Sequence, residues 1–411
     1  MNLAITESIP LDATLRIKIF SVLSLSIFTA MLGLGIVVPI LPLYAKTLGA
    51  SGIWLGAIFA GFSIARAASM PVVGHFSDKQ GRKVFIVTGL FLYAFSSLGY
   101  LSASGPESLL VVRIVQGLCS AMIVPIAMAY VGDIAPKDRE GSYVGRFNVA
   151  LFLGFGFGPL LGGFVHDLLG VNADFMIMGI LCALSCALAL WYLPAGDGKR
   201  MMRSGAPAAY ATILRNPQVQ GIMLFRFLNA FIRGSVLTFL PLYASYRLHL
   251  SGAQIGLIVS SGVILTSLLQ YPCGRLADRF DRKHLMISGS LVYAVCVVLL
   301  PQMPNFVLLL GANLLLGGVG AVPLPAASAS VIEEGKKYGM GSLMALFNVA
   351  MSLGLGTGPL VSGFIHDTLG LTRVFYCAAG IGAVGALVTA RLLRFLPPAQ
   401  RKQMPDFFEE P

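Results

Sequence analysis

The stretch NVALFLGFGFGPLLGGFVHDLLG occupies residues 148–170, and NVAMSLGLGTGPLVSGFIHDTLG occupies residues 348–370. The longer segments 141–170 and 341–370 align without a gap at an offset of 200, with 18 of 30 positions identical. Both stretches are apolar, rich in glycine and interrupted by one proline. A duplication at this spacing indicates that the chain contains one structural unit twice.

The chain as a whole is too apolar for a water-soluble protein. Its 411 residues are 56% hydrophobic and 11% charged, whereas soluble domains carry about 25% charged residues. A membrane-crossing helix needs about 20 apolar residues, and transmembrane β-strands alternate over about ten. The runs here do not alternate, so they predict an all-α integral membrane protein. The 12 predicted transmembrane helices cover 19–44, 53–76, 84–103, 108–132, 143–166, 174–194, 218–245, 253–277, 284–303, 306–332, 342–366 and 374–396.

The segment PAGDGKRMMRSGAPAAYATILRNPQ, which starts at Pro194, separates the sixth run from the seventh. Its basic, small and turn-forming residues predict a linker. Six helices in each half would make the repeats parallel, related by an axis along the membrane normal. We therefore predict a six-helix bundle over 1–196, a cytoplasmic linker over 197–217, a second six-helix bundle over 218–396 and a cytoplasmic tail over 397–411.

The net charge of +11 indicates membrane topology rather than nucleic-acid binding. With the N-terminus inside, 22 Lys and Arg residues fall on cytoplasmic segments or helix ends, and only Lys46, Arg247 and Arg373 fall outside. Cytoplasmic loops of membrane proteins carry such an excess. We expect both termini in the cytoplasm and the chain in a bacterial cytoplasmic (inner) membrane. No Cys/His spacing suggests a metal site, and no cofactor is expected.

Glycines of the repeated stretch share one helix face. Gly154, Gly158 and Gly162 recur every four residues, a spacing that lets another helix approach closely. Pro159 and its counterpart Pro359, which follows Gly358, each allow a kink. One interpretation is ordinary small-residue packing. The other, favoured by the repetition, is a bending helix at an interface that moves.

Two short charged loops also repeat at an offset of 200. GHFSDKQGRK (74–83) lies between the second and third helices, and GRLADRFDRK (274–283) lies between the eighth and ninth. Gly74 would permit close packing and Gly81 a tight turn. The basic residues of these loops are explained if they only fix the orientation of the chain in the membrane. That explanation does not account for the aspartate at the same position of both loops, Asp78 and Asp278. The acids at this surface are Asp78, Asp133, Asp278 and Glu333, the last being the counterpart of Asp133.

The first loop resembles the signature loop of the major facilitator superfamily. Its residues are Gly74-x-x-x-Asp78-Lys79-x-Gly81-Arg82-Lys83. Three further patterns are similar to those of the twelve-helix drug:proton antiporter branch. They are Leu32-Gly33 with Pro39-x-x-Pro42 in the first helix, Arg113-x-x-Gln116-Gly117 in the fourth, and Gly145, Gly154, Gly158-Pro159 and Gly162-Gly163 in the fifth.

The resemblance implies a rocker-switch carrier with the major facilitator fold. Its central cavity would be lined by helices one, four, seven and ten, and helices two, five, eight and eleven would form the moving interface. The charged residues would act as a cytoplasmic latch that favours the outward-open state. That latch comprises Asp78, Arg82, Lys83, Asp133, Asp278 and Arg282. The second loop departs from the pattern, because Asp281 stands where Gly81 does.

Four arginines lie inside predicted helices, and no Asp or Glu lies deep in any of them. Insertion scales put the cost of a mid-helix arginine at about 2.5–3.5 kcal/mol, and such residues usually face a cavity. In the seventh helix, Arg226, Asn229 and Arg233 fall within about 60° of one face. The alternative is that backbone carbonyls satisfy these arginines or that they snorkel. The predicted cavity residues are Arg66, Arg113, Gln116, Arg226, Asn229 and Arg233.

An electropositive cavity without acids favours a substrate with a carboxylate, phosphate or sulfonate, which suits the planar arginine fork. We therefore expect a proton-coupled exporter of small amphiphilic compounds, biased towards anionic or acceptor-rich substrates. Proton coupling and export follow from the resemblance alone. The alternative is an uptake permease or exchanger of organic anions. Catalytic and nucleotide-binding motifs are absent, which disfavours an enzyme, and the short linker and tail disfavour a signalling scaffold.

Overall fold

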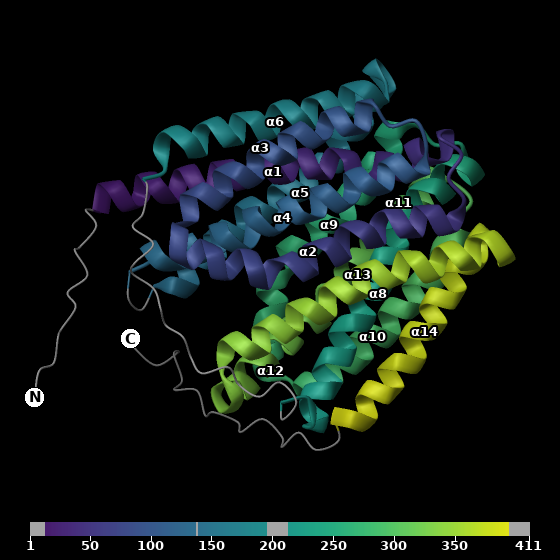
Figure 1. Cartoon of the computed structure of the whole chain (residues 1–411). Coiled ribbons are helices and arrows are strands. Elements are labelled where there is room, and N and C mark those ends of the chain that lie inside the picture. Colours follow the sequence, from purple (N-terminus) through teal and green to yellow (C-terminus); the bar gives the residue numbers. More distant parts are fainter. Residues whose placement is uncertain (1–12, 137–138, 195–212, 394–411) are drawn as a thin grey trace, which may run out of the picture.

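The computed structural model describes residues 13–136, 139–194 and 213–393 (Figure 1). Every regular element in these ranges is helical, and 12 segments are long and apolar enough to cross a membrane. The first half contains α1 (Ala13–Thr47), α2 (Gly52–Gln80), α3 (Arg82–Leu101), α4 (Pro106–Ile134), α5 (Glu140–Leu169) and α6 (Val171–Tyr192). The second half contains α8 (Pro217–Leu248), α9 (Gly252–Arg279), α10 (Arg282–Leu299), η2 (Leu300–Gln302), α11 (Phe306–Gly320), α12 (Pro323–Tyr338), α13 (Met340–Leu369) and α14 (Leu371–Leu392).

The tenth transmembrane segment differs from its prediction. The sequence predicts one helix over 306–332, whereas the structure interrupts it between α11 and α12. Pro323 has no N–H to donate, and its ring clashes with the carbonyl four residues earlier. The first half has Ile123 at the corresponding position and one continuous helix, α4, although Pro125 and Pro325 correspond. The additional proline therefore explains why only one of the two repeats is broken.

Two helix pairs make most of the contact between the two halves. α2 packs against α13, and α5 packs against α9. Within the first half α1 packs against α5 and α6, and within the second half α8 packs against α13 and α14. We call the α2–α13 and α5–α9 contacts the seam.

The two ends of the bundle differ. We call the end where α1 and α8 begin, and where α6 and α14 end, the near end. The opposite end, which holds the α1–α2 and α5–α6 connections, is the far end. In Figure 1 the halves lie together at the far end and diverge towards the near end. The bundle is therefore closed at the far end in this conformation.

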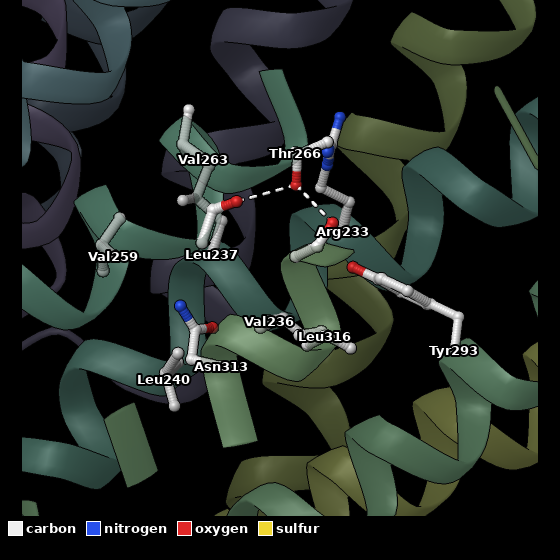
Figure 2. A pocket seen from close by; sticks show the side chains of 12 residues that line it. Arg233, Val236, Leu237, Leu240, Val259, Val263, Thr266, Tyr293, Asn313 and Leu316 are labelled. Atoms are coloured by element: carbon white, nitrogen blue, oxygen red, sulfur yellow. Dashed lines mark hydrogen bonds between the residues drawn. The ribbon is translucent and has the colours of Figure 1, made fainter. Parts of the chain in front are cut away.

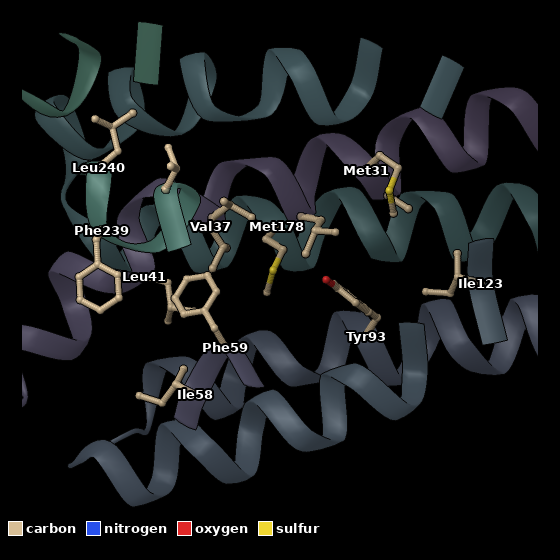
Figure 3. Packing of buried hydrophobic residues seen from close by; sticks show 14 of the residues in the cluster. Met31, Val37, Leu41, Ile58, Phe59, Tyr93, Ile123, Met178, Phe239 and Leu240 are labelled. Carbon is tan, nitrogen blue, oxygen red and sulfur yellow. The ribbon is translucent and has the colours of Figure 1, made fainter. Parts of the chain in front are cut away.

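Buried side chains continue from one half to the other near the far end. Phe239 and Leu240 of α8 lie beside Val37 and Leu41 of α1 in one hydrophobic cluster, which Phe59 of α2 also joins (Figure 3). Close packing is the main force between helices in a membrane, where lipid is as apolar as the side chains. This shared cluster therefore contributes to holding the far end closed.

Candidate functional site

Arg82 joins the near ends of three helices of the first half. Its Nη1 lies 2.5 Å from Asp78 Oδ1, its Nε lies 3.1 Å from Asp133 Oδ2, and it also donates to Ser77 Oγ at 2.9 Å. The structure thus brings together three of the predicted latch residues, and Lys83 takes no part in these contacts. All of them belong to the first half, so in this conformation the cluster ties α2, α3 and α4 together without crossing the seam.

The second half forms a different version of this cluster. Arg282 Nη1 lies 2.8 Å from Glu333 Oε2, at the place where Arg82 meets Asp133. Asp278, which the sequence analysis placed in the latch, does not take part in this pair. Asp281 is the N-cap of α10, and its side chain accepts a hydrogen bond from the His284 N–H at 3.1 Å. The replacement of a glycine by this aspartate therefore changes both the turn and the pairing.

The charged loop of the first half is mostly helix, contrary to the prediction. α2 continues to Gln80, and the turn consists of Gly81 alone, with φ of +96°. The predicted tight turn at Gly81 is confirmed, because this conformation strains any residue with a side chain. The prediction that Gly74 permits close packing is wrong for this conformation, since nothing lies within 4 Å of where its Cβ would be.

Four glycines of the repeated stretch, Gly154, Gly158, Gly162 and Gly358, do not face the other half. A Cβ on Gly154, Gly158 or Gly162 would collide with the backbone of α1, and one on Gly358 would collide with the backbone of α8. The repeated stretch therefore does pack closely, but these four glycines bring α5 against α1 and α13 against α8. They attach the seam helices to their own halves.

Other glycines make the seam itself. A Cβ on Gly163 would collide with the Gly252 carbonyl group, and one on Gly256 would collide with the Pro159 carbonyl oxygen. Corresponding contacts in the other copy join Gly363 to Gly52 and Gly56 to Pro359. Ser260 Oγ also accepts a hydrogen bond from the Leu160 N–H at 2.8 Å. The two prolines of the repeat therefore lie at the helix crossings of the seam.

Gly163→Ala should destabilise the protein more than the same change at Gly145. Both residues lie in α5, but the new methyl group meets backbone at Gly163 and open space at Gly145. Overpacking costs about 1–3 kcal/mol when the neighbour cannot move aside. The midpoint of thermal unfolding in detergent checks this, and equal midpoints for the two variants would contradict the close contact.

Two carboxylates bridge the halves at the far end. Asp167 of α5 accepts hydrogen bonds from the N–H groups of Gly252 and Ala253, at 2.7 and 2.8 Å. Asp367 of α13 accepts from the N–H groups of Gly52 and Ile53, at 2.6 and 2.9 Å. Each carboxylate therefore binds the start of a helix that belongs to the other half.

Arg113 is buried and held by its own half. Its Nη1 donates to Gln116 Oε1 at 2.8 Å, and its guanidinium lies 5.2 and 4.4 Å from the ring centroids of Phe59 and Phe62. Gln116 also accepts a hydrogen bond from Tyr100 at 2.7 Å. Arg113 and Gln116 are thus brought together as predicted, but aromatic rings cover the cation in this conformation.

Two other interior arginines, Arg226 and Arg66, lie beside sulfur or aromatic groups rather than carboxylates. The Arg226 guanidinium donates to Met351 Sδ at 2.6 Å and lies 4.7 Å from the Phe347 ring centroid. Arg66 of α2 is half-buried and lies near Tyr93, and its Nε has no hydrogen-bond partner among the described atoms. Neither arginine has a described ion pair with a carboxylate.

Arg233 borders a cavity of about 70 Å³ between α8, α9, α10 and α11 (Figure 2). The walls are mainly apolar and include Val236, Leu240, Val259 and Leu316. None of the ion pairs in the described part of the chain involves Arg233. The cavity therefore offers one cation, free of a carboxylate, beside an apolar surface.

The other polar residues of this cavity are mostly engaged with backbone. Thr266 donates to the carbonyl oxygens of Gly262 and Gly317, and Asn313 donates to that of Ile258. Tyr293, which the sequence analysis missed, points its hydroxyl towards Arg233 (Figure 2). Tyrosines in apolar runs are common, so only the repeat relation between Tyr93 and Tyr293 could have suggested it.

The predicted polar stripe on α8 splits between different neighbours. Asn229 borders a smaller space that α10 and α14 complete, including Ser290 and Thr389. Tyr293 lines both this space and the Arg233 cavity. The shared helix face was predicted, but the surrounding helices divide it.

Comparisons with known proteins agree with this architecture. The family model described as Major Facilitator Superfamily matches residues 23–243 and 222–409. The uncharacterized MFS-type transporter MJ1560 of Methanocaldococcus jannaschii is 31% identical over 374 residues, covering 90% of this chain and 96% of that protein. The quinolone resistance protein NorA of Staphylococcus aureus is 25% identical over 378 residues, covering 89% and 94%.

A solved structure has the same fold. The crystal structure of the nucleoside transporter NupG superposes with a TM-score of 0.75 at 17% identity, covering 93% of this chain and 100% of that one. The twelve spans, the two six-helix repeats and the family match over both halves lead to one assignment. The chain is a multi-pass membrane transporter of the major facilitator superfamily.

Proposed function

We propose that this transporter exports small amphiphilic compounds with a carboxylate or other acceptor groups, in exchange for protons. It works by alternating access between two bundles, residues 1–196 and 218–396, joined by a cytoplasmic linker over 197–217. The near end faces the cytoplasm, because the Lys and Arg residues gather there. The tail over 397–411 and most of the linker lie outside the described residues.

The observation that carries this proposal is the Arg233 cavity. A guanidinium without a carboxylate partner gains most from an anionic or acceptor group, which it can bind with two parallel hydrogen bonds. The apolar wall formed by Val236, Leu240, Val259 and Leu316 would contact a hydrocarbon or aromatic body once the cavity widens, since its present volume of about 70 Å³ is below the roughly 300 Å³ of a small-molecule pocket. Together they favour an amphiphile over a small inorganic anion.

Export and proton coupling are supported by the relatives. The chain is similar over nearly its whole length to a protein named for quinolone resistance, and efflux is one route to resistance. The sequence motifs of the first, fourth and fifth helices are similar to those of drug:proton antiporters. The Arg82 cluster is proposed to tie α2 to its neighbours while the near end opens and closes.

Transport by the purified protein tests the proposal. Proteoliposomes containing a pH-sensitive dye receive matched anionic, neutral and cationic lipophilic compounds. We expect proton movement with the anionic and acceptor-rich compounds, because only they match the cavity. Proton movement with cations alone would contradict the substrate class and leave an antiporter.

An organic-anion exchanger is the second candidate. It is favoured by the lack of any carboxylate ion-paired with the four interior arginines in the described part of the chain, since such a carboxylate would be the simplest carrier for a proton. Counterflow of a labelled organic anion without proton movement would select this alternative.

A further inference from the structure

Both carboxylate bridges at the far end have the same construction. In each, one aspartate from the last turn of a seam helix accepts hydrogen bonds from the first two N–H groups of the opposite seam helix. Asp167 and Asp367 lie 200 residues apart, as do Gly52 and Gly252. The arrangement therefore occurs once in each copy of the repeat and crosses the seam in both directions.

These contacts are additional to ordinary helix capping. Ser51 already caps α2, with its Oγ accepting from the Trp54 N–H at 3.4 Å. Ser251 caps α9 in the same way, with its Oγ accepting from the Gln254 N–H at 3.3 Å. Four N–H groups at a helix start lack intrahelical partners. The serines supply an acceptor for the third, and the aspartates from the other half supply acceptors for the first two.

Charge and helix dipole favour each bridge, although both carboxylates are exposed to solvent. Hydrogen bonds to an ionised carboxylate are short, and the positive end of the helix dipole attracts the negative charge. The backbones must also approach closely, which the glycine pairs Gly163–Gly252 and Gly363–Gly52 allow. When a bridge separates, one carboxylate and two backbone N–H groups lose their hydrogen-bond partners together.

We propose that the two bridges are clasps that hold the far end closed, and that both must release before the transporter can open to that side. This inference rests on the proposed alternating access, because a carrier that never opened at the far end would not need releasable contacts there. The clasps set how much of the protein is open at the far end without substrate. Weakening them shifts the population towards that conformation.

Hydrogen–deuterium exchange of the purified full-length protein, without substrate, tests the clasps. The variants are Asp167→Ala, Asp367→Ala and the double variant. In the double variant we expect exchange about tenfold faster in peptides from the starts of α2 and α9, since bound N–H groups open more readily when their acceptors are lost. Peptides from the near ends of α2 and α9 should exchange more slowly, because the near end closes as the far end opens.

Matched variants separate this effect from general destabilisation. Glu107→Gln removes one negative charge at the far end on an exposed residue of α4, which is not a seam helix, so its exchange should match the unmodified protein. The double variant Asp167→Asn with Asp367→Asn keeps one acceptor at each position and should give an intermediate shift. It replaces the double alanine variant in the exchange experiment if that variant does not fold.

Two outcomes would overturn the proposal. One is unchanged exchange at the far end in the variants that lack the carboxylates. The other is faster exchange at both ends, which would mean that the aspartates serve only stability. Because no substrate is present, the result is independent of the flux assay. A shift in exchange would support the clasps even if the proposed substrate class were wrong.

Discussion

Arg233→Ala should abolish most transport of anionic compounds while leaving the protein folded. The side chain borders a cavity rather than filling a packed core, and no carboxylate of a described ion pair depends on it. A hydrogen bond to a charged group contributes about 1.5–3 kcal/mol, which corresponds to a loss of about 10- to 150-fold in affinity. The measurement is initial uptake of a labelled organic anion into inside-out vesicles across a range of concentrations.

The variant Arg233→Lys separates charge from geometry. Lysine keeps the charge but loses the planar fork, so transport of carboxylates should fall between that of the alanine variant and that of the unmodified protein. Arg373→Ala is the matched control, because Arg373 is exposed at the far end and donates to the carbonyl oxygen of Leu369, four residues earlier. Unchanged anion transport in Arg233→Ala would remove the cavity from the substrate pathway.

The helical period predicted which α8 residues share a face, but not what each of them meets. Arg226, Asn229 and Arg233 do lie along one side of α8. Three different sets of helices then surround that side, so Arg226 meets Met351, Asn229 borders the space beside α14, and Arg233 borders the cavity with α11. A single-helix pattern carries no information about which neighbour lies where.

The same limit applies to the glycines. Their four-residue spacing predicted a close helix approach, and the approach is there. The partner of Gly158 is Gly35 in α1, whereas the partner of Gly163, five residues later, is Gly252 in the other half. Five residues correspond to about 500° of helix rotation, so these neighbouring glycines face directions about 140° apart. Which face meets which half depends on the assembled bundle.

Spans and repeat symmetry were the most predictable features, because length and hydropathy act locally. The twelve predicted runs correspond to twelve spans. The break before Pro323 was also readable in principle, since its counterpart in the first half is Ile123. The charged loop was misjudged because its polarity suggested a turn, although nothing from Gly74 to Gln80 prevents α2 from continuing into water.

The second large effect is expected at the near end. Gly74 in α2 and Gly274 in α9 belong to seam helices, and nothing lies within 4 Å of a Cβ built on either. Gly74→Leu combined with Gly274→Leu should therefore fold normally in the conformation described here. If the near end closes during transport, these positions approach α13 and α5, and the added side chains obstruct that approach. Overpacking of about 1–3 kcal/mol would slow closure by about 5- to 150-fold.

Flux into proteoliposomes, compared with the thermal unfolding midpoint, checks this expectation. The double leucine variant should transport about 5- to 150-fold more slowly while keeping the midpoint of the unmodified protein, since only the alternative conformation is obstructed. Gly132→Leu is the matched control, because Gly132 also has open space around it but lies at the near end of α4, outside the seam. Full transport by the double variant would contradict the expectation. It would mean that Gly74 and Gly274 do not approach α13 and α5 during transport, and that the near end closes through other contacts.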